Sequence, residues 1–266
     1  MRHHFRLLQS TLEQPLKSAE VLCGLAQIMS TIEALDPKDR APGGINDWRF
    51  LREMTPSATV FDSQIARTSV INGILVGRLT ASTLLVVSNH SRIRQASAAY
   101  VALSHALLGK QTINGGDGAD QMAAIILGAS AIGRSQGGAN QDLATSFISA
   151  QLILSYFVSG FTKIFGPEWR NGVALERVMR THAYGDADLY ILLRRNPKVG
   201  EFITHFTVAL ETAFPLLVLN RRTRLAALAA MGGFHAVNAR LMGLGRFMLC
   251  FIAAYPSLLR TMDQSS

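Results

Sequence analysis

A single lysine lies at the end of a long apolar stretch, in the sequence LSYFVSGFTKIFGPEWRNGVAL at residues 154–175. If Lys163 faces the interior of a helix bundle, its apolar surroundings disfavour the charged form, and a neutral amine is a base. A lysine at a helix end can instead extend its ammonium to the lipid headgroups, so both interpretations stay open. Gly166 and Pro167 end the helix directly after the lysine, and Trp169 is typical of a membrane interface.

Further polar residues, including Glu211, His235, Asn238 and Arg240, lie in the apolar stretches FTVALETAFPLLVL and GGFHAVNARLMGLGRF. Ionisable groups in membrane segments are costly, so they usually face partners or a cavity. For Glu211 and Arg240 we expect a structural ion pair between helices, with direct catalysis as the alternative. His235 and Asn238 lie one helical turn apart on one face, which suits a polar helix contact or the headgroup of a ligand.

No residue pattern predicts a metal site. His105 and His205 are isolated, and Cys23 and Cys250 are too far apart in the sequence to argue for a metal site or a disulfide. The sequence GGDGADQM resembles a calcium loop only superficially, because it lacks the EF-hand spacing and the terminal Glu. We expect Asp117 in this sequence to be the N-cap of a helix instead.

The composition favours a membrane protein. Of the 266 residues, 48% are hydrophobic and only 17% are charged, whereas soluble domains carry about 25% charged residues. The net charge of +8 comes from short basic groups between apolar stretches, and no basic run is interleaved with aromatic residues, so we expect no nucleic-acid binding. The N-terminal sequence MRHHFRLLQSTLEQPLKSAE lacks a contiguous apolar core and is not expected to be a cleaved signal peptide.

Seven apolar stretches approach the length of about 20 residues that a membrane-spanning helix needs. We therefore predict an all-α fold, a polytopic transmembrane helix bundle with about seven or eight spans, as a single domain over residues 1–266. Polar loops at 36–67 and 166–201 are long enough for small helices or lids. The alternative is a soluble all-helical protein with very apolar helices. The stretches are residues 18–35, 69–87, 95–108, 121–133, 143–164, 202–219 and 225–259, the last with a turn near Gly243 to Gly245.

The distribution of basic residues predicts the orientation. Arg2, Arg6 and Lys17 place the N-terminus inside, and the short loops at 88–94, 134–142 and 220–224 then lie inside as well. The helix end that carries Lys163 is consequently predicted to be extracytoplasmic. The outer segment at 166–201 also carries basic residues, but longer loops contribute less to the rule.

Three of these segments resemble one membrane-protein family. YFVSGFTKIFGPEWRNGVAL, ETAFPLL and FHAVNARLMGLGRF, in this order, resemble the membrane domain of vitamin K-dependent γ-carboxylases and their bacterial relatives, the horizontally transferred transmembrane (HTTM) domain. EVLCGLAQIMSTIEAL and GGDGADQM are similar to its first helix and to a motif of its bacterial branch. That branch includes a membrane protein that matures a secreted sporulation-delaying toxin. The resemblance implies an integral protein of a bacterial cytoplasmic membrane.

The resemblance also implies roles for individual residues. Tyr156, Phe157, Gly160 and Lys163 fill the family pattern Y-F-x-x-G-x-x-K, whose lysine is the base that deprotonates reduced vitamin K. Oxygen then adds to the cofactor, the resulting strong base removes a γ-proton from a substrate glutamate, and carbon dioxide adds. The implied catalytic residues are Lys163, His235 and Asn238, and the implied cofactor-binding residues are Tyr156, Phe157, Gly160, Glu211 and Trp169.

The chain also departs from the family. Thr162 stands where the animal enzymes have a second basic residue, the region NGGDGAD lacks their histidine, and 266 residues leave no room for their large lumenal portion. Two hypotheses therefore stay open. The first is a γ-glutamyl carboxylase-like lyase, or a related enzyme that uses reduced vitamin K or another quinol to modify a secreted peptide. The second is a non-enzymatic membrane protein for toxin or peptide maturation, export or immunity, in which Lys163 only anchors a helix.

Overall fold

The computed structural model describes residues 14–113, 116–135 and 138–264. Within these residues every regular element is a helix and no strand is present, which confirms the all-α prediction. Most of the N-terminal stretch that was analysed as a possible signal peptide, including Arg2 and Arg6, lies outside the described residues. The chain divides into two compact units, residues 1–148 with 249–266 and residues 149–248.

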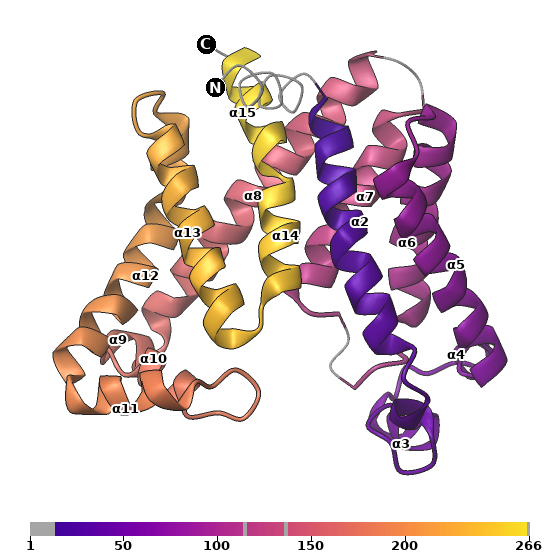
Figure 1. The fold of residues 1–266 in the computed structure, drawn as a ribbon, viewed down its shortest axis with the longest axis horizontal. Helices are drawn as coiled ribbons and strands as arrows, with labels where there is room; N and C mark the ends of the chain where they lie inside the picture. Colours follow the sequence, from indigo (N-terminus) through magenta and orange to yellow (C-terminus); the bar gives the residue numbers. More distant parts are fainter. Residues whose placement is uncertain (1–13, 114–115, 136–137, 265–266) are drawn as a thin grey trace. The chain divides into compact units, whose positions relative to one another are not determined.

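Four long helices form the first unit. They are α2 (Pro15–Ala34), α5 (Thr68–Val87), α6 (Ser91–Leu108) and α7 (Gly118–Gly133). Helix α2 packs against α5 and α7, and α6 packs against the same two helices, so the four surround one apolar core (Figure 1). Four of the predicted apolar stretches are confirmed as helices by these elements. Fully buried side chains in this core include Leu75, Leu85, Ile126 and Leu127.

The first unit also contains the chain's last helix and several short ones. Helix α15 (Tyr255–Gln264) packs on α2. The polar stretch at 36–67 holds three short helices, as its length allowed. These are η1 (Pro37–Arg40), α3 (Trp48–Met54) and α4 (Val60–Ile65).

A buried cluster of charges holds the first unit together at one end of α2. The carboxylate of Glu20 is fully buried and accepts from the guanidinium groups of Arg94 and Arg134 and from the hydroxyl of Ser130. The Arg94 side chain is only 1% exposed, and it also donates to the main-chain carbonyl of Lys17. Breaking a buried ion pair leaves an uncompensated charge, which is strongly destabilising. The two arginines that the sequence analysis assigned to short loops are therefore part of the interior.

Helices α8 to α13 supply the second unit. Its elements are the later part of α8 (Gly138–Phe165), α9 (Pro167–Arg170), α10 (Ala174–Met179), α11 (Ala187–Arg195), α12 (Pro197–Leu219) and α13 (Arg224–Met242). Helix α12 packs against α13, and the short helices α9, α10 and α11 pack against α12 (Figure 1). The polar stretch at 166–201 thus holds α9 to α11.

The final apolar stretch turns where its glycines predicted. Helix α13 ends at Met242, and Gly243 has a left-handed conformation with φ 71°, which glycine adopts without the steric cost that other residues meet. Helix α14 (Gly245–Ala253) follows. A further break between Ala253 and Tyr255 separates α14 from α15, and this second break was not predicted.

Three of the described helices are long and apolar enough to cross a membrane, namely α5, α8 and α12, and α7 is a shorter apolar helix. Helix α12 leaves Phe202, Phe206, Leu216 and Leu219 exposed. Large apolar side chains along the outside of a long helix are expected where lipid replaces water. The structure therefore supports the membrane character that the composition predicted.

The stability of helix α4 is expected to depend on pH through the carboxylate of Asp62. The main-chain N–H and hydroxyl of Thr59 donate to the carboxylate of Asp62 at 2.7 and 2.8 Å, and Lys110 donates at 3.0 Å. These hydrogen bonds lower the pKa of Asp62 to about 2. Because the unfolded pKa is about 3.9, the stabilisation is present above that pH and is lost as the pH falls toward about 2.

We therefore expect the amides of α4 to lose protection from hydrogen exchange, after correction for the intrinsic rate, as the pH falls from about 4 to about 2. Asp62→Asn should show the weaker protection already at neutral pH. The control is Glu53→Gln, which changes an exposed carboxylate on the neighbouring α3. Equal protection in Asp62→Asn and wild type at neutral pH would contradict this assignment.

Candidate functional site

Three of the four residues of the family pattern share one face of α8 with Ser159. Tyr156, Ser159, Gly160 and Lys163 follow each other at intervals of three, one and three residues, which brings them onto one stripe of a helix. Phe157 begins a second stripe on another face, where neighbouring phenylalanine rings contact each other. The polar face of α8 is the one that meets α12.

Gly160 lets the two helices approach closely. A Cβ atom at Gly160 would lie 2.5 Å from the main-chain nitrogen of Thr212 and 2.9 Å from the main-chain carbon of Glu211. Main-chain atoms cannot rotate away, so only glycine fits at this position. The close approach brings Glu211 within reach of the Lys163 side chain, one helical turn further along α8.

Lys163 and Glu211 form an ion pair. The Nζ atom of Lys163 lies 2.5 Å from Oε2 of Glu211, and the two side chains are 19% and 7% exposed. The Ser159 hydroxyl accepts from Nζ at 2.6 Å and donates to the same carboxylate oxygen at 3.1 Å. Lys163, Ser159 and Glu211 thus form a closed ring of hydrogen bonds, which we call the lysine cluster.

Trp169 covers the lysine cluster. Its ring lies 5.1 Å from Nζ of Lys163, within the range of a cation–π interaction. The break at Gly166 and Pro167 turns the chain so that Trp169, on the following short helix, comes back to the end of α8. Trp169 was predicted from its position as an interface residue, and the structure adds a direct contact with the amine.

A second polar contact lies one turn earlier on α8. The hydroxyl of Tyr156 and Nε2 of His235 are 2.6 Å apart, and both residues are buried. The ring of Phe214 lies 4.3 Å from that of Tyr156, and the ring of Phe247 lies 5.4 Å from that of His235. Aromatic surroundings of this kind exclude water and strengthen the hydrogen bond.

The structure brings together most, but not all, of the predicted site residues. Tyr156, Gly160 and Lys163 lie on the α8 face that meets α12. Lys163 contacts Glu211 of α12 and Trp169 of α9, and Tyr156 contacts His235 of α13. Phe157 lies instead on the other stripe of α8, and its side chain is 39% exposed. Asn238 is half-buried near the end of α13, where its main-chain carbonyl accepts from the N–H of Gly243.

One expectation about the partners was wrong, and one member of the cluster was missed. Glu211 was expected to pair with Arg240, but its carboxylate pairs with Lys163 because Gly160 brings α8 and α12 together. Ser159 was not predicted as a site residue. Its position four residues before Lys163 on a helix was the available signal, since residues at this spacing face each other.

Replacing Gly160 tests the close approach. We expect Gly160→Ala to destabilise the second unit by about 1–3 kcal/mol, because the added methyl group meets the main chain of α12. Thermal unfolding of the purified protein measures this. Gly233→Ala on α13 is the matched control, because a Cβ there meets nothing within 4 Å. An equal or higher melting temperature in Gly160→Ala would contradict the argument.

Comparison with known proteins bears on this region. Residues 141–262 match the model of one protein family, the HTTM domain. No curated protein and no solved structure matches the chain. The matched range contains the lysine cluster, the contact between Tyr156 and His235, and two of the three helices that can cross a membrane. Over residues 141–262, somewhat less than half of its length, the chain is therefore similar to the HTTM domain, and this match and the apolar helices indicate a membrane protein of the carboxylase-like family.

Proposed function

We propose that this protein is a quinol-linked membrane enzyme that modifies a secreted peptide, with Lys163 as the base. The reaction is γ-glutamyl carboxylation or a related quinol-dependent modification. The observation that carries the proposal is the lysine cluster, in which Nζ lies 2.5 Å from the Glu211 carboxylate on a largely buried helix contact. We propose that the protein belongs to the bacterial branch of the family and that its role includes the maturation of a peptide toxin.

The ion pair supplies a route to a neutral amine. A proton can pass from the ammonium of Lys163 to the carboxylate of Glu211, which leaves two uncharged groups. Burial among apolar side chains favours uncharged forms. Nζ then has a lone pair and can accept a proton from a ligand hydroxyl, while the Ser159 hydroxyl keeps both side chains aligned. Glu211 is therefore proposed as the group that holds the proton, rather than as a purely structural partner.

The residues around the lysine cluster fit a quinol. A quinol needs a flat apolar site and polar groups that can exchange protons with its hydroxyls. Tyr156 and His235 supply such groups among the rings of Phe214 and Phe247, and Trp169 is proposed to complete the site, with Asn238 in a supporting role. Phe157 faces the other stripe of α8, and the main chain of α12 fills the space at Gly160, so neither is placed to contact the quinol. Reduced vitamin K or another quinol would supply the electrons and the acidic hydroxyl.

We also propose how the helices cross the bacterial cytoplasmic membrane. The proposed spans are α5, α8 and α12 together with α2, α6, α7 and α13. Helices α14 and α15 together form the proposed eighth span. At 1.5 Å per residue, the 28 residues of α8 extend about 42 Å, which exceeds the hydrocarbon thickness of about 30 Å. In the first unit Lys17, Arg94 and Arg134 gather at one end. This supports the cytoplasmic assignment of that end, with Lys163 extracytoplasmic.

One observation favours a non-enzymatic function. The Glu211 carboxylate, the Ser159 hydroxyl and the Trp169 ring together satisfy the ammonium of Lys163. A lysine held in this way can serve only to join α8 to α12. In that case the protein would act in maturation, export or immunity of a peptide without chemistry of its own.

Lys163→Arg separates the two functions. Arginine keeps the charge and can still pair with Glu211, but it does not give up its proton. A base role predicts that quinol oxidation by the purified protein falls about 100-fold or more in both Lys163→Arg and Lys163→Ala. The assay follows oxidation of vitamin K hydroquinone with and without a candidate peptide. Lys198→Arg, at an exposed position on α12, is the matched control.

The thermal midpoint is measured on the same samples. We expect Lys163→Arg to unfold close to the wild-type temperature and Lys163→Ala at a lower one, because alanine leaves Glu211 without its cationic partner. If Lys163→Arg oxidises quinol as fast as the wild type, the base assignment fails. If the wild type oxidises quinol no faster than protein-free vesicles, the non-enzymatic function is the better explanation.

A further inference from the structure

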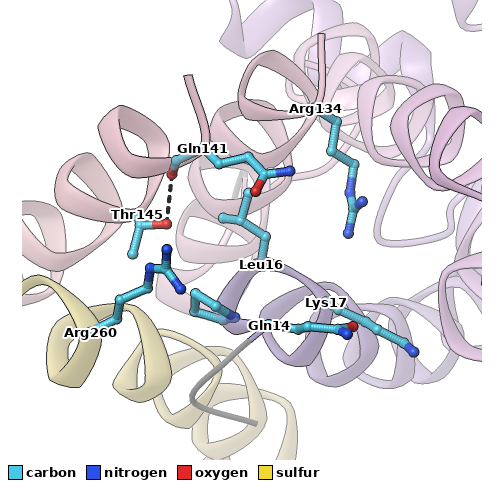
Figure 2. A pocket seen from close by; sticks show the side chains of 8 residues that line it. Gln14, Leu16, Lys17, Arg134, Gln141, Thr145 and Arg260 are labelled. Atoms are coloured by element: carbon cyan, nitrogen blue, oxygen red, sulfur yellow. Dashed lines mark hydrogen bonds between the residues drawn. The ribbon is translucent and has the colours of Figure 1, made fainter. Parts of the chain in front are cut away.

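A pocket of about 200 Å³ lies in the first unit, where α2 and α8 begin and α7 and α15 end. Liquid water occupies about 30 Å³ per molecule, so the pocket has room for a small polar group. Arg134, Gln141, Thr145 and Arg260 contribute to its walls. In the view of Figure 2, the guanidinium groups of Arg134 and Arg260 lie on opposite sides of the pocket.

Positive charge predominates among the described residues that line this pocket. The single carboxylate of Glu20 is shared by two guanidinium groups, those of Arg94 and Arg134. Asp142 pairs with Arg260 at 3.2 Å. Of the described residues that line the pocket, Lys17, Arg134 and Arg260 are cationic and none is acidic.

Part of this positive charge is shielded from water. The Arg134 side chain is only 10% exposed, and a charge that is shielded from water attracts an anion more strongly than an exposed one does. The start of α2 adds to the same effect, because a helix N-terminus carries a partial positive charge. Gln14, its N-cap residue, makes no side-chain capping bond to the first turn. The amide of Gln141 and the hydroxyl of Thr145 provide uncharged polar groups in the wall.

We propose that this pocket binds the phosphate group of an anionic phospholipid. Arginine presents N–H donors in a planar fork that matches phosphate oxygens. Basic residues grouped at the ends of membrane helices attract anionic lipid headgroups, and the pocket opens where four helices of the first unit begin or end. The proposal concerns the first unit alone and does not depend on the function of Lys163.

The experiment compares two double variants with the same change in net charge. Lys17→Gln with Arg260→Gln removes two cations from the pocket but leaves the buried cluster of Glu20, Arg94 and Arg134 intact. Arg221→Gln with Arg222→Gln removes two exposed cations from the loop between α12 and α13. The full-length protein in neutral detergent is titrated with phosphatidylglycerol, phosphatidylcholine or inorganic phosphate, and its melting temperature is measured.

We expect phosphatidylglycerol to raise the melting temperature of the wild type and of the loop variant at similar concentrations. The pocket variant should need about tenfold more lipid, because charged hydrogen bonds to the headgroup are lost. If phosphatidylcholine is equally effective, or if both variants lose the response equally, the pocket is not an anionic-lipid site. If inorganic phosphate saturates the shift and lipid adds nothing, the site takes free phosphate and the lipid proposal fails.

Asp142→Asn provides a test in the opposite direction. Asp142 is half exposed, so its replacement leaves the core unchanged while it frees Arg260 for a ligand. This variant should respond at a lower concentration of phosphatidylglycerol than the wild type. A weaker response, in a variant that remains folded and monodisperse, would overturn the proposal even if the double pocket variant cannot be purified.

Discussion

A charge inside a bundle of apolar helices needs an opposite charge and hydrogen-bond partners, and this requirement shapes both units. In the second unit the ammonium of Lys163 is met by Glu211 from a different helix. In the first unit the carboxylate of Glu20 is met by Arg94 and Arg134. Leaving a buried charge unpaired destabilises a fold more than most packing defects do. Each of these ion pairs therefore favours the arrangement in which its helices are neighbours.

The ion pair in the second unit depends on how closely the main chains approach. At Gly160 a single added carbon would lie 2.5 Å from main-chain nitrogen of α12. Polar groups of α8 then follow in successive turns. Tyr156 binds His235 of α13, and Ser159 and Lys163 in the following turns bind Glu211 of α12. Gly160, Ser159 and Lys163 therefore act together: the glycine allows α12 to approach, and the hydroxyl and the ammonium both bind the Glu211 carboxylate.

The sequence predicted local features well because they depend on nearby residues. Apolar length predicted the long helices, Gly243 predicted a turn, and Asp117 was correctly predicted as an N-cap, since its carboxylate accepts from the N–H of Asp120 at 2.9 Å. Partners across helices were harder. Arg240 and Lys163 were both chemically suitable for Glu211, and only the packing of α8 on α12 decides between them. Arg94 looked like a loop residue because nothing nearby in the sequence shows that Glu20 lies beside it.

The two charge clusters differ in composition, and this difference decides what each can do with a proton. The lysine cluster pairs one ammonium with one carboxylate, so the transfer of a single proton would leave both groups uncharged. The Glu20 cluster pairs one acid with two guanidinium groups, which hold their protons at every accessible pH. Arg134 of this cluster also lines the pocket proposed to bind a lipid phosphate. The first arrangement fits the proposed proton transfer, and the second fits the proposed lipid site.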